Sequence, residues 1–145
     1  MNSELDHAPR VLDSLQVGCD VHSVANTTES IEIFGESYLN RVFSFRERAE
    51  CVGHAVTERL TGRFAAKEAV LKAMRVPAGI AIPWPTIEVL ADEVGAPVVH
   101  LSGAAADFAS RAGIGRIEVS LSHDGGFALA FAVAVPTASL QERAA

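Results

Sequence analysis

A long helical segment at residues 54–75 is the feature that most restricts how this chain can fold. No proline interrupts it, and its apolar side chains recur at helical spacing, at Val56, Leu60, Phe64 and Leu71. The proline-rich stretch 76–85 then ends the helix, because proline removes a backbone donor and clashes with the preceding turn. A helix with a single apolar stripe has to bury it against another layer, so the rest of the chain must supply that layer.

Three alternating segments predict that this layer is a mainly antiparallel sheet. Residues 15–24 form one alternating strand, while residues 86–103 and 115–135 each resemble two strands joined by a turn. In the first segment the two faces are predicted to differ, with Val17, Cys19 and Val21 on the buried one and Gly18, Asp20 and His22 on the other.

The order of these segments is strand, helices, two strands, helix, two strands. That order predicts an α+β fold, in a single domain over residues 15–136, with a mainly antiparallel sheet packed against the long helix. We expect a flexible N-terminal segment at 1–14 and a frayed C-terminal tail at 137–145.

Local signals predict where the shorter helices begin and end. Asn26 or Thr27 can cap a first helix, which Gly35 weakens in its middle, and Ser44 can cap a second one. Gly113 is placed to end a third helix that begins near residue 104.

Composition narrows the classes of function. The net charge of −6 argues against nucleic acid as the main partner and suits a strongly acidic protein partner poorly. We expect no contact with membranes, because no apolar run is long enough to cross a bilayer. The first ten residues lack the order of a secretion signal, so a cytoplasmic protein is predicted. Cys19 and Cys51 are not at metal-binding spacing, and reduced, mostly buried thiols are expected.

Four polar residues stand out against this apolar framework. Asp20 interrupts the first strand, Glu68 borders the apolar stripe of the long helix, and His123 ends a strand just before a glycine turn. Glu68 and Lys72 lie four residues apart, on one helix face. Taken singly, these are an ordinary surface ion pair, a strand-ending aspartate and a turn histidine. Taken together, two carboxylates suit Mg²⁺ and the lysine suits a phosphate, which favours phosphoryl-group transfer.

Five motifs in order give the chain a family resemblance. They are GCDV at 18–21, RVFSFRE at 41–47, GRFAAKEAVLKA at 62–73, WPTIEV at 84–89 and VSLSH at 119–123. The chain resembles the holo-acyl-carrier-protein synthases, which are small single-domain phosphopantetheinyl transferases. The helical motif is the most specific of the five.

The resemblance implies a reaction and a fold, the 4′-phosphopantetheinyl transferase fold. Such enzymes move 4′-phosphopantetheine from coenzyme A to a serine of an apo acyl (or peptidyl) carrier protein and release adenosine 3′,5′-bisphosphate. By position, Asp20 and Glu68 are expected to hold Mg²⁺, and Glu68, Lys72 and His123 to be catalytic. Lys72, His123 and Arg63 are expected to bind the coenzyme. Either Glu68 or a metal-coordinated water would be the general base.

The resemblance also implies a homotrimer, in which His123 and the metal ligands of one site come from different protomers. Two departures from the family pattern bear on partners. Asn26 stands where the family usually has a basic residue for an acidic carrier, which leaves Arg41, Arg46, Arg48 and Arg63 as candidate carrier contacts. The segment RVPAG at 75–79 replaces a glycine-rich one, which bears on coenzyme affinity or loop shape. These changes favour a specialised carrier, in polyketide or peptide synthesis rather than fatty-acid synthesis.

Two other functions are compatible with the same residues. One is a carrier-protein-binding module of the same fold with impaired catalysis. The other is a Mg²⁺-dependent nucleotide diphosphate hydrolase, although such an enzyme is expected to have more carboxylates on one helix than Glu58 and Glu68.

Overall fold

The computed structural model describes residues 14–141 of the chain, so the flexible segment expected at 1–14 lies almost wholly outside the described residues. The elements follow the predicted order: β1 (Gln16–Ser23), α1 (Val24–Val42), α2 (Phe45–Glu50), α3 (Val56–Ala73), the 3₁₀ helix η1 (Trp84–Thr86), β2 (Ile87–Ala91), β3 (Pro97–Leu101), α4 (Gly103–Arg111), β4 (Ile114–Asp124), β5 (Phe127–Pro136) and α5 (Thr137–Gln141). The α+β prediction is confirmed.

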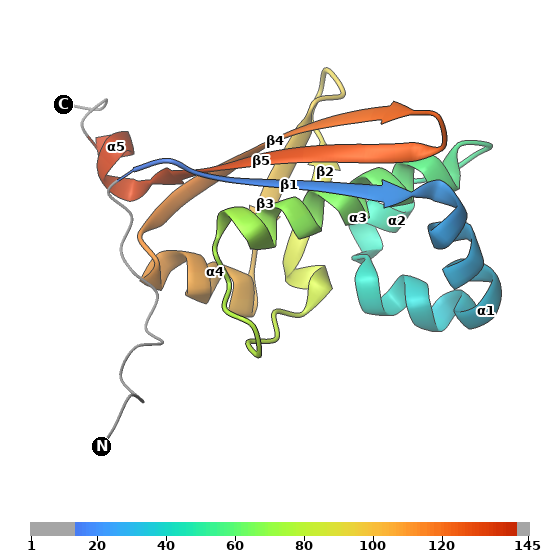
Figure 1. Cartoon of the computed structure of the whole chain (residues 1–145), viewed down its shortest axis with the longest axis horizontal. Helices are drawn as coiled ribbons and strands as arrows, with labels where there is room; N and C mark the ends of the chain where they lie inside the picture. Colours follow the sequence, from blue (N-terminus) through green and yellow to red (C-terminus); the bar gives the residue numbers. More distant parts are fainter. Residues whose placement is uncertain (1–13, 142–145) are drawn as a thin grey trace.

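The strands form two antiparallel sheets rather than one. The larger sheet has the order β1-β5-β4, and the smaller pairs β2 with β3. The long helix α3 lies along one face of the larger sheet, and α1 and α4 lie on that same side (Figure 1). The register places Asp20 opposite Ala130 and His22 opposite Ala128, while His123 is opposite Ala128 from the other side.

Small residues let α3 approach the larger sheet closely. On β5 every second residue is a fully buried alanine, at Ala128, Ala130, Ala132 and Ala134. On β1 the contact residue is Gly18, where an added Cβ would lie only 2.0 Å from the Ala69 carbonyl oxygen and 2.6 Å from the Ala73 nitrogen. A side chain at residue 18 would therefore push the strand off the helix.

The predicted faces of β1 are reversed. Val17 and Val21 are each 60% exposed and Cys19 is exposed too, while Gly18 is buried against α3. The reason is that alanine and glycine already fill the narrow space beneath the helix, so the large apolar side chains of the sheet face outward. The same outer face carries Phe127, Leu129 and Phe131 of β5, all exposed. We call these residues the outer sheet face: Val17, Cys19, Val21, Phe127, Leu129 and Phe131.

Helix α3 begins and ends within the predicted range 54–75, but its buried side is broader than the apolar stripe. Leu60 is buried as predicted, but four of the nine buried residues are alanines, and Lys67 is buried too, with no exposed surface. Lys67 is buried because other elements offer its ammonium three oxygen acceptors.

Most of the predicted helix starts and ends are confirmed, with a correction at the start of α1. Helix α1 begins at Val24 with Ser23 as N-cap, before Asn26 and Thr27, and Gly35 interrupts it at φ 51° and ψ −132°. Ser44 caps α2, as predicted, and the cap is a reciprocal capping box with Glu47 that the sequence analysis did not identify. Within the tail expected at 137–145, Thr137–Gln141 forms the short helix α5, and residues 142–145 lie outside the described residues.

The expected absence of a membrane span can be checked over part of the chain. Within residues 14–141, none of the helices is at once long and apolar enough to span a bilayer.

Candidate active site

Three of the predicted site residues meet where β1 crosses α3. The Lys72 ammonium donates to the Asp20 carboxylate at 2.9 Å and to the Cys19 carbonyl oxygen at 2.9 Å. Glu68 lies one helical turn before Lys72, close enough to Asp20 and Lys72 for both charges to act on its carboxyl group. Lys72 is thus the partner of a residue 52 positions away, and not simply of Glu68 on its own helix.

The electrostatics of this group favour a bound cation. Partial burial raises the pKa of the Glu68 carboxyl, the Asp20 charge raises it further, and Lys72 lowers it only in part. The hydrogen bond to Asp20 is the main reason that the pKa of Lys72 is raised, so its ammonium stays charged. Two carboxylates thus share a single ammonium, which leaves them one cation short.

The donor set can be tested against Mg²⁺. Among residues 14–141, no group of three or more His, Cys, Asp or Glu side chains is placed to hold a metal ion. Mg²⁺ does not need one, because it is commonly held by one or two carboxylates and completes its octahedron with waters and substrate phosphates. Asp20 and Glu68 are two hard oxygen donors that repel each other, so they fit the ion.

A buried contact on the opposite side of α3 sets the direction of Glu68. The Lys67 ammonium donates to the Val42 and Trp84 carbonyl oxygens at 2.9 and 3.0 Å, and to Glu47 at 2.7 Å. Successive residues of a helix are turned by about 100°. With Lys67 held in this pocket, Glu68 is turned away from it and toward β1 and Asp20.

His123 does not join this group within one chain. It ends β4, and its Nε2 lies 3.1 Å from the carbonyl oxygen of Glu58. The ring also occupies space that only a glycine at residue 62 leaves open, because an added Cβ there would lie 2.8 Å from Nε2. Glu58 precedes Glu68 by ten residues, which is about 15 Å along a helix. The histidine thus lies against the N-terminal half of α3, whereas Glu68 and Lys72 belong to its C-terminal half.

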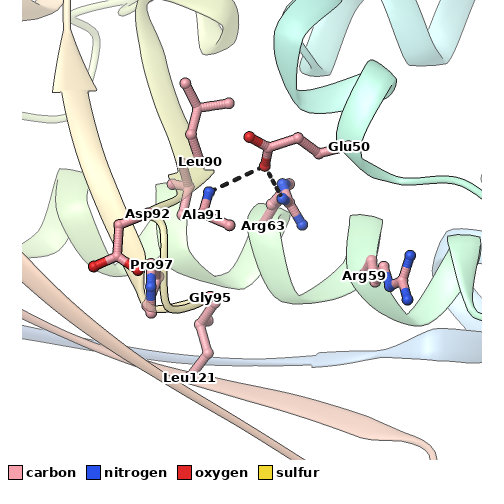
Figure 2. A pocket seen from close by; sticks show the side chains of 10 residues that line it. Glu50, Arg59, Arg63, Leu90, Ala91, Asp92, Gly95, Pro97 and Leu121 are labelled. Atoms are coloured by element: carbon pink, nitrogen blue, oxygen red, sulfur yellow. Dashed lines mark hydrogen bonds and ion pairs between the residues drawn. The ribbon is translucent and has the colours of Figure 1, made fainter.

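Arg63 lies in a third place, on the side of α3 that faces the β2–β3 hairpin. Its guanidinium pairs with Glu50 at 2.6 Å, and the same Glu50 oxygen accepts the Ala91 N–H at 3.0 Å (Figure 2). The Arg63 Nε is buried without a hydrogen-bond partner. A cleft of about 750 Å³ opens here, lined by Arg59, Arg63, the hairpin turn and Leu121.

Sequence reasoning assigned Arg63 but missed its surroundings. Arg59 and Arg63 both line this cleft, and their spacing of four residues on a predicted helix was the available signal. Glu50 and the hairpin turn could not be added, because their approach depends on the packing of α2 and the smaller sheet.

His22 was placed on the Asp20 face of β1 but given no role. Its ring packs edge-on against Phe64, with 4.6 Å between centroids, and Phe64 in turn contacts Trp84 at 5.2 Å. Burial lowers the pKa of His22, although the Asp20 charge opposes this. The neutral ring thus forms an apolar wall next to the carboxylates.

Comparison with protein families gives a match over most of the chain. The model of the 4′-phosphopantetheinyl transferase superfamily matches residues 16–133, which include every residue of the three places described above. Among curated proteins, the holo-[acyl-carrier-protein] synthase of Chlorobaculum tepidum is 37% identical over 123 residues, covering 84% of this chain and 99% of that protein. The synthase of Desulforudis audaxviator is 39% identical over 130 residues, covering 89% and 98%.

Solved structures agree with these relatives. A Chronobacterium ammoniagenes ACPS–CoA complex superposes with a TM-score of 0.74 at 32% identity, covering 86% of this chain and 99% of that one. The Helicobacter pylori holo-[acyl-carrier-protein] synthase in complex with coenzyme A gives 0.73 at 29% identity, covering 82% and 99%.

Proposed function

This chain belongs to the 4′-phosphopantetheinyl transferase superfamily, and from that premise we propose how its own residues carry out the transfer. It acts as a holo-acyl-carrier-protein synthase, moving 4′-phosphopantetheine from coenzyme A to a serine hydroxyl of an apo acyl carrier protein. The observation that carries the proposal is the contact of Lys72 with Asp20 beside Glu68, which joins two carboxylates and an ammonium from separate motifs.

The reaction breaks a phosphoanhydride bond in coenzyme A and forms a phosphodiester link to serine. The serine oxygen attacks the phosphorus that bears pantetheine, and the bond from that phosphorus to the bridging oxygen of the diphosphate breaks. The bridging oxygen leaves with the electron pair as part of adenosine 3′,5′-bisphosphate. The serine proton passes to a base, and negative charge grows on the departing phosphate. Such reactions are accelerated mainly by positioning and by charge neutralisation.

Each residue of the group has a distinct part in this scheme. Asp20 and Glu68 would hold Mg²⁺, which supplies positive charge against the diphosphate when bound. Lys72, half exposed and kept protonated by Asp20, would meet the charge on the leaving phosphate. Glu68, next to Asp20 and Lys72, is our candidate for the base, with a metal-coordinated water as the alternative.

We propose that each active site is shared between protomers of a homotrimer. Two observations support sharing. The outer sheet face presents six apolar or thiol side chains that nothing in the chain covers among residues 14–141. His123 and Arg63, both expected to bind the coenzyme, lie away from Asp20 and Glu68. In such a trimer a neighbour's His123 and Arg63 would complete the site at Asp20 and Glu68.

The exposed residues of α1 suit a carrier protein that is less acidic than usual. This helix leaves the end of β1 just after Asp20, and Asn26, Glu29 and Glu32 are exposed in its first half (Figure 1). Of the four arginines expected to contact the carrier, three are already paired with a carboxylate: Arg46, Arg48 and Arg63. A carrier domain of polyketide or peptide synthesis is therefore our proposal. Two free thiols, Cys19 and Cys51, suit a cytoplasmic location.

Mass spectrometry of apo carrier proteins incubated with coenzyme A, Mg²⁺ and the protein tests the function. A mass increase of one phosphopantetheine group is expected, and Asp20→Ala and Glu68→Ala should each abolish most of it while the protein stays folded. Cleaved coenzyme with an unmodified carrier would instead identify a hydrolase. Carrier binding without any reaction would identify the impaired binding module. Near-normal turnover of either variant would remove that residue from the mechanism.

Mixing two inactive variants tests the sharing of sites. Asp20→Ala protomers and His123→Ala protomers should regain part of the activity when unfolded and reassembled together, because some interfaces then contain one intact site. Each variant reassembled alone is the control and should stay inactive. A monomer by light scattering would contradict the shared site.

A further inference from the structure

Arg75 has a backbone conformation that arginine rarely adopts. Its φ is +54°, and among residues 14–141 it is the one non-glycine residue with a positive φ. The left-handed region disfavours any residue with a Cβ, and the position just after a helix is most often glycine for that reason. Here the Arg75 N–H bonds the Lys72 carbonyl oxygen at 3.1 Å and the Val76 N–H bonds that of Leu71 at 3.2 Å, which closes α3. Glycine would close the helix equally well without strain.

The fold makes no recorded use of the Arg75 side chain. Arg75 is exposed, and within the described part of the chain its guanidinium takes part in no ion pair or side-chain hydrogen bond. Arg46, Arg48, Arg63 and Arg116 each pair with a carboxylate, whereas Arg41, Arg59 and Arg111 share with Arg75 the lack of an ion pair within residues 14–141, and of these four only Arg75 has a positive φ. A strained position that keeps an unpaired charge indicates that the charge serves something outside the chain.

The position of Arg75 indicates which ligand its charge could contact. It directly follows the helix end that carries Lys72, and the backbone hydrogen bond ties the two residues together. Asp20, Glu68, Lys72 and one Mg²⁺ together carry a single positive charge, while a diphosphate carries two negative ones. One negative charge of the diphosphate is then left without a partner, and one further cation at this end of α3 would neutralise it.

We propose that Arg75 is a second phosphate-binding residue, which contacts the diphosphate of coenzyme A from the end of α3. The inference rests on the proposed function, because it takes the diphosphate to lie against Asp20, Glu68 and Lys72. An arginine suits this part, since its planar guanidinium can donate two parallel hydrogen bonds to phosphate oxygens.

Titration calorimetry of coenzyme A into the Mg²⁺-loaded protein, beside thermal unfolding without ligand, tests the proposal. Arg75→Gly should weaken coenzyme binding by about tenfold or more, as expected for loss of a charge-assisted hydrogen bond. The same variant should unfold at an equal or higher temperature, because the strain is relieved. Arg75→Asn, which tolerates the left-handed region, should lose affinity likewise, and Arg75→Lys should keep most of it.

Two controls separate this from a general effect of charge. Arg111 also ends a helix, is exposed and has no recorded ion pair within residues 14–141, so Arg111→Gly should leave the affinity unchanged. Dephospho-coenzyme A lacks the 3′-phosphate but keeps the diphosphate, so Arg75→Gly should weaken both ligands by the same factor. If only coenzyme A is affected, the diphosphate assignment is wrong. Unchanged affinity in Arg75→Gly would leave Arg75 a helix-end residue only.

These results are independent of whether the proposed function holds. A wild-type protein that binds coenzyme A but modifies no carrier would overturn the transfer reaction, and the Arg75 variants would still be decided by their binding constants. A wild-type protein that does not bind coenzyme A would overturn both proposals.

Discussion

Lys67 and Lys72 lie five residues apart on α3, and each pairs with a carboxylate from another element. The distances are nearly equal, 2.7 Å from Lys67 to Glu47 and 2.9 Å from Lys72 to Asp20. The surroundings differ completely. Both side chains of the first pair are 0% exposed, whereas in the second pair Lys72 is 52% exposed and Asp20 17% exposed.

The difference separates a structural pair from one available to a ligand. Every recorded bond of Lys67 goes to the protein itself, and Glu47 in addition accepts the N–H groups of Ser44 and Val89. Burial lowers the pKa of Lys67, while the hydrogen bond to Asp20 raises that of Lys72. The buried ammonium therefore has nothing left to offer a substrate. The exposed one could donate to a phosphate, and Asp20 would then be free to hold a metal ion.

Removing the buried lysine should have the largest effect on folding. Lys67→Ala leaves Glu47 charged and unpaired in the interior, and breaking a buried pair in this way typically costs about 3–5 kcal/mol of stability. Urea denaturation monitored by circular dichroism measures it. The exposed Arg116→Ala is the control and should lie within about 0.5 kcal/mol of wild type. A loss below about 1 kcal/mol for Lys67→Ala would mean that the pair does not hold α3 in place.

Removing the exposed lysine should be felt in catalysis instead. Lys72→Ala should lower kcat/KM by an amount equivalent to about 2–4 kcal/mol, because charge on the leaving phosphate is no longer neutralised. Its stability should change little, as exposed ion pairs contribute about 0–1 kcal/mol. Kinetics and melting temperature on the same preparation decide between the two. A lower melting temperature with normal catalysis would make Lys72 an ordinary surface residue. Full activity of Lys72→Arg would mean that only its charge matters.

Gly18 can disrupt the exposed pair without touching the buried one. In Gly18→Ala the new methyl group collides with the Ala69 carbonyl oxygen and the Ala73 nitrogen, so β1 and Asp20 must shift away from α3. We expect a destabilisation of about 1–3 kcal/mol, as for other overpacked sites, with a larger proportional loss of activity. Cys19→Ala, whose side chain faces away from the helix, is the matched control. Normal kcat/KM in Gly18→Ala would show that the site tolerates a displaced strand.

The smallest predicted effect is a change in thermal stability on replacing Glu68 with glutamine, and it depends on pH. Its folded pKa is raised above the usual 4.5, so the folded state favours the protonated carboxyl. Its contribution to stability is therefore full below pH 4.5 and is lost as the pH rises through the folded pKa. Without divalent metal, Glu68→Gln should melt at a slightly higher temperature than wild type at pH 7, and this gain should shrink toward pH 4.5. A gain that does not vary with pH would contradict the raised pKa.

Local patterns predicted much of the fold correctly. The order of helices and strands, the N-cap at Ser44 and the two hairpin turns follow from turn chemistry and periodicity, which act over a few residues. Alternation in β1 also showed which side chains share a face. It could not show which face meets the helix, because the usual rule that apolar residues point inward fails where the interior has room only for alanine and glycine.

Some features of the candidate site could likewise be predicted from the sequence, while others depend on packing. Spacing alone put Glu68 and Lys72 on one face of α3, and the motifs marked Asp20, Arg63 and His123 as residues of interest. Lys67 has the same positive charge as Lys72 and lies on the same helix, and no local pattern in the sequence shows that Lys67 is buried. Its burial depends on Glu47, Val42 and Trp84, which reach it from separate parts of the chain.

By itself, then, the sequence determined the elements, the family resemblance and the residue types needed for phosphoryl transfer. Only the tertiary structure decided that Lys72 pairs with Asp20, that Lys67 is structural, and that His123 lies against the N-terminal half of α3. The physical reason is that the oxygen acceptors and the solvent around a charged side chain decide whether it is structural or available to a ligand. In this chain those oxygens come from residues 17 to 65 positions away, which no local pattern can bring together.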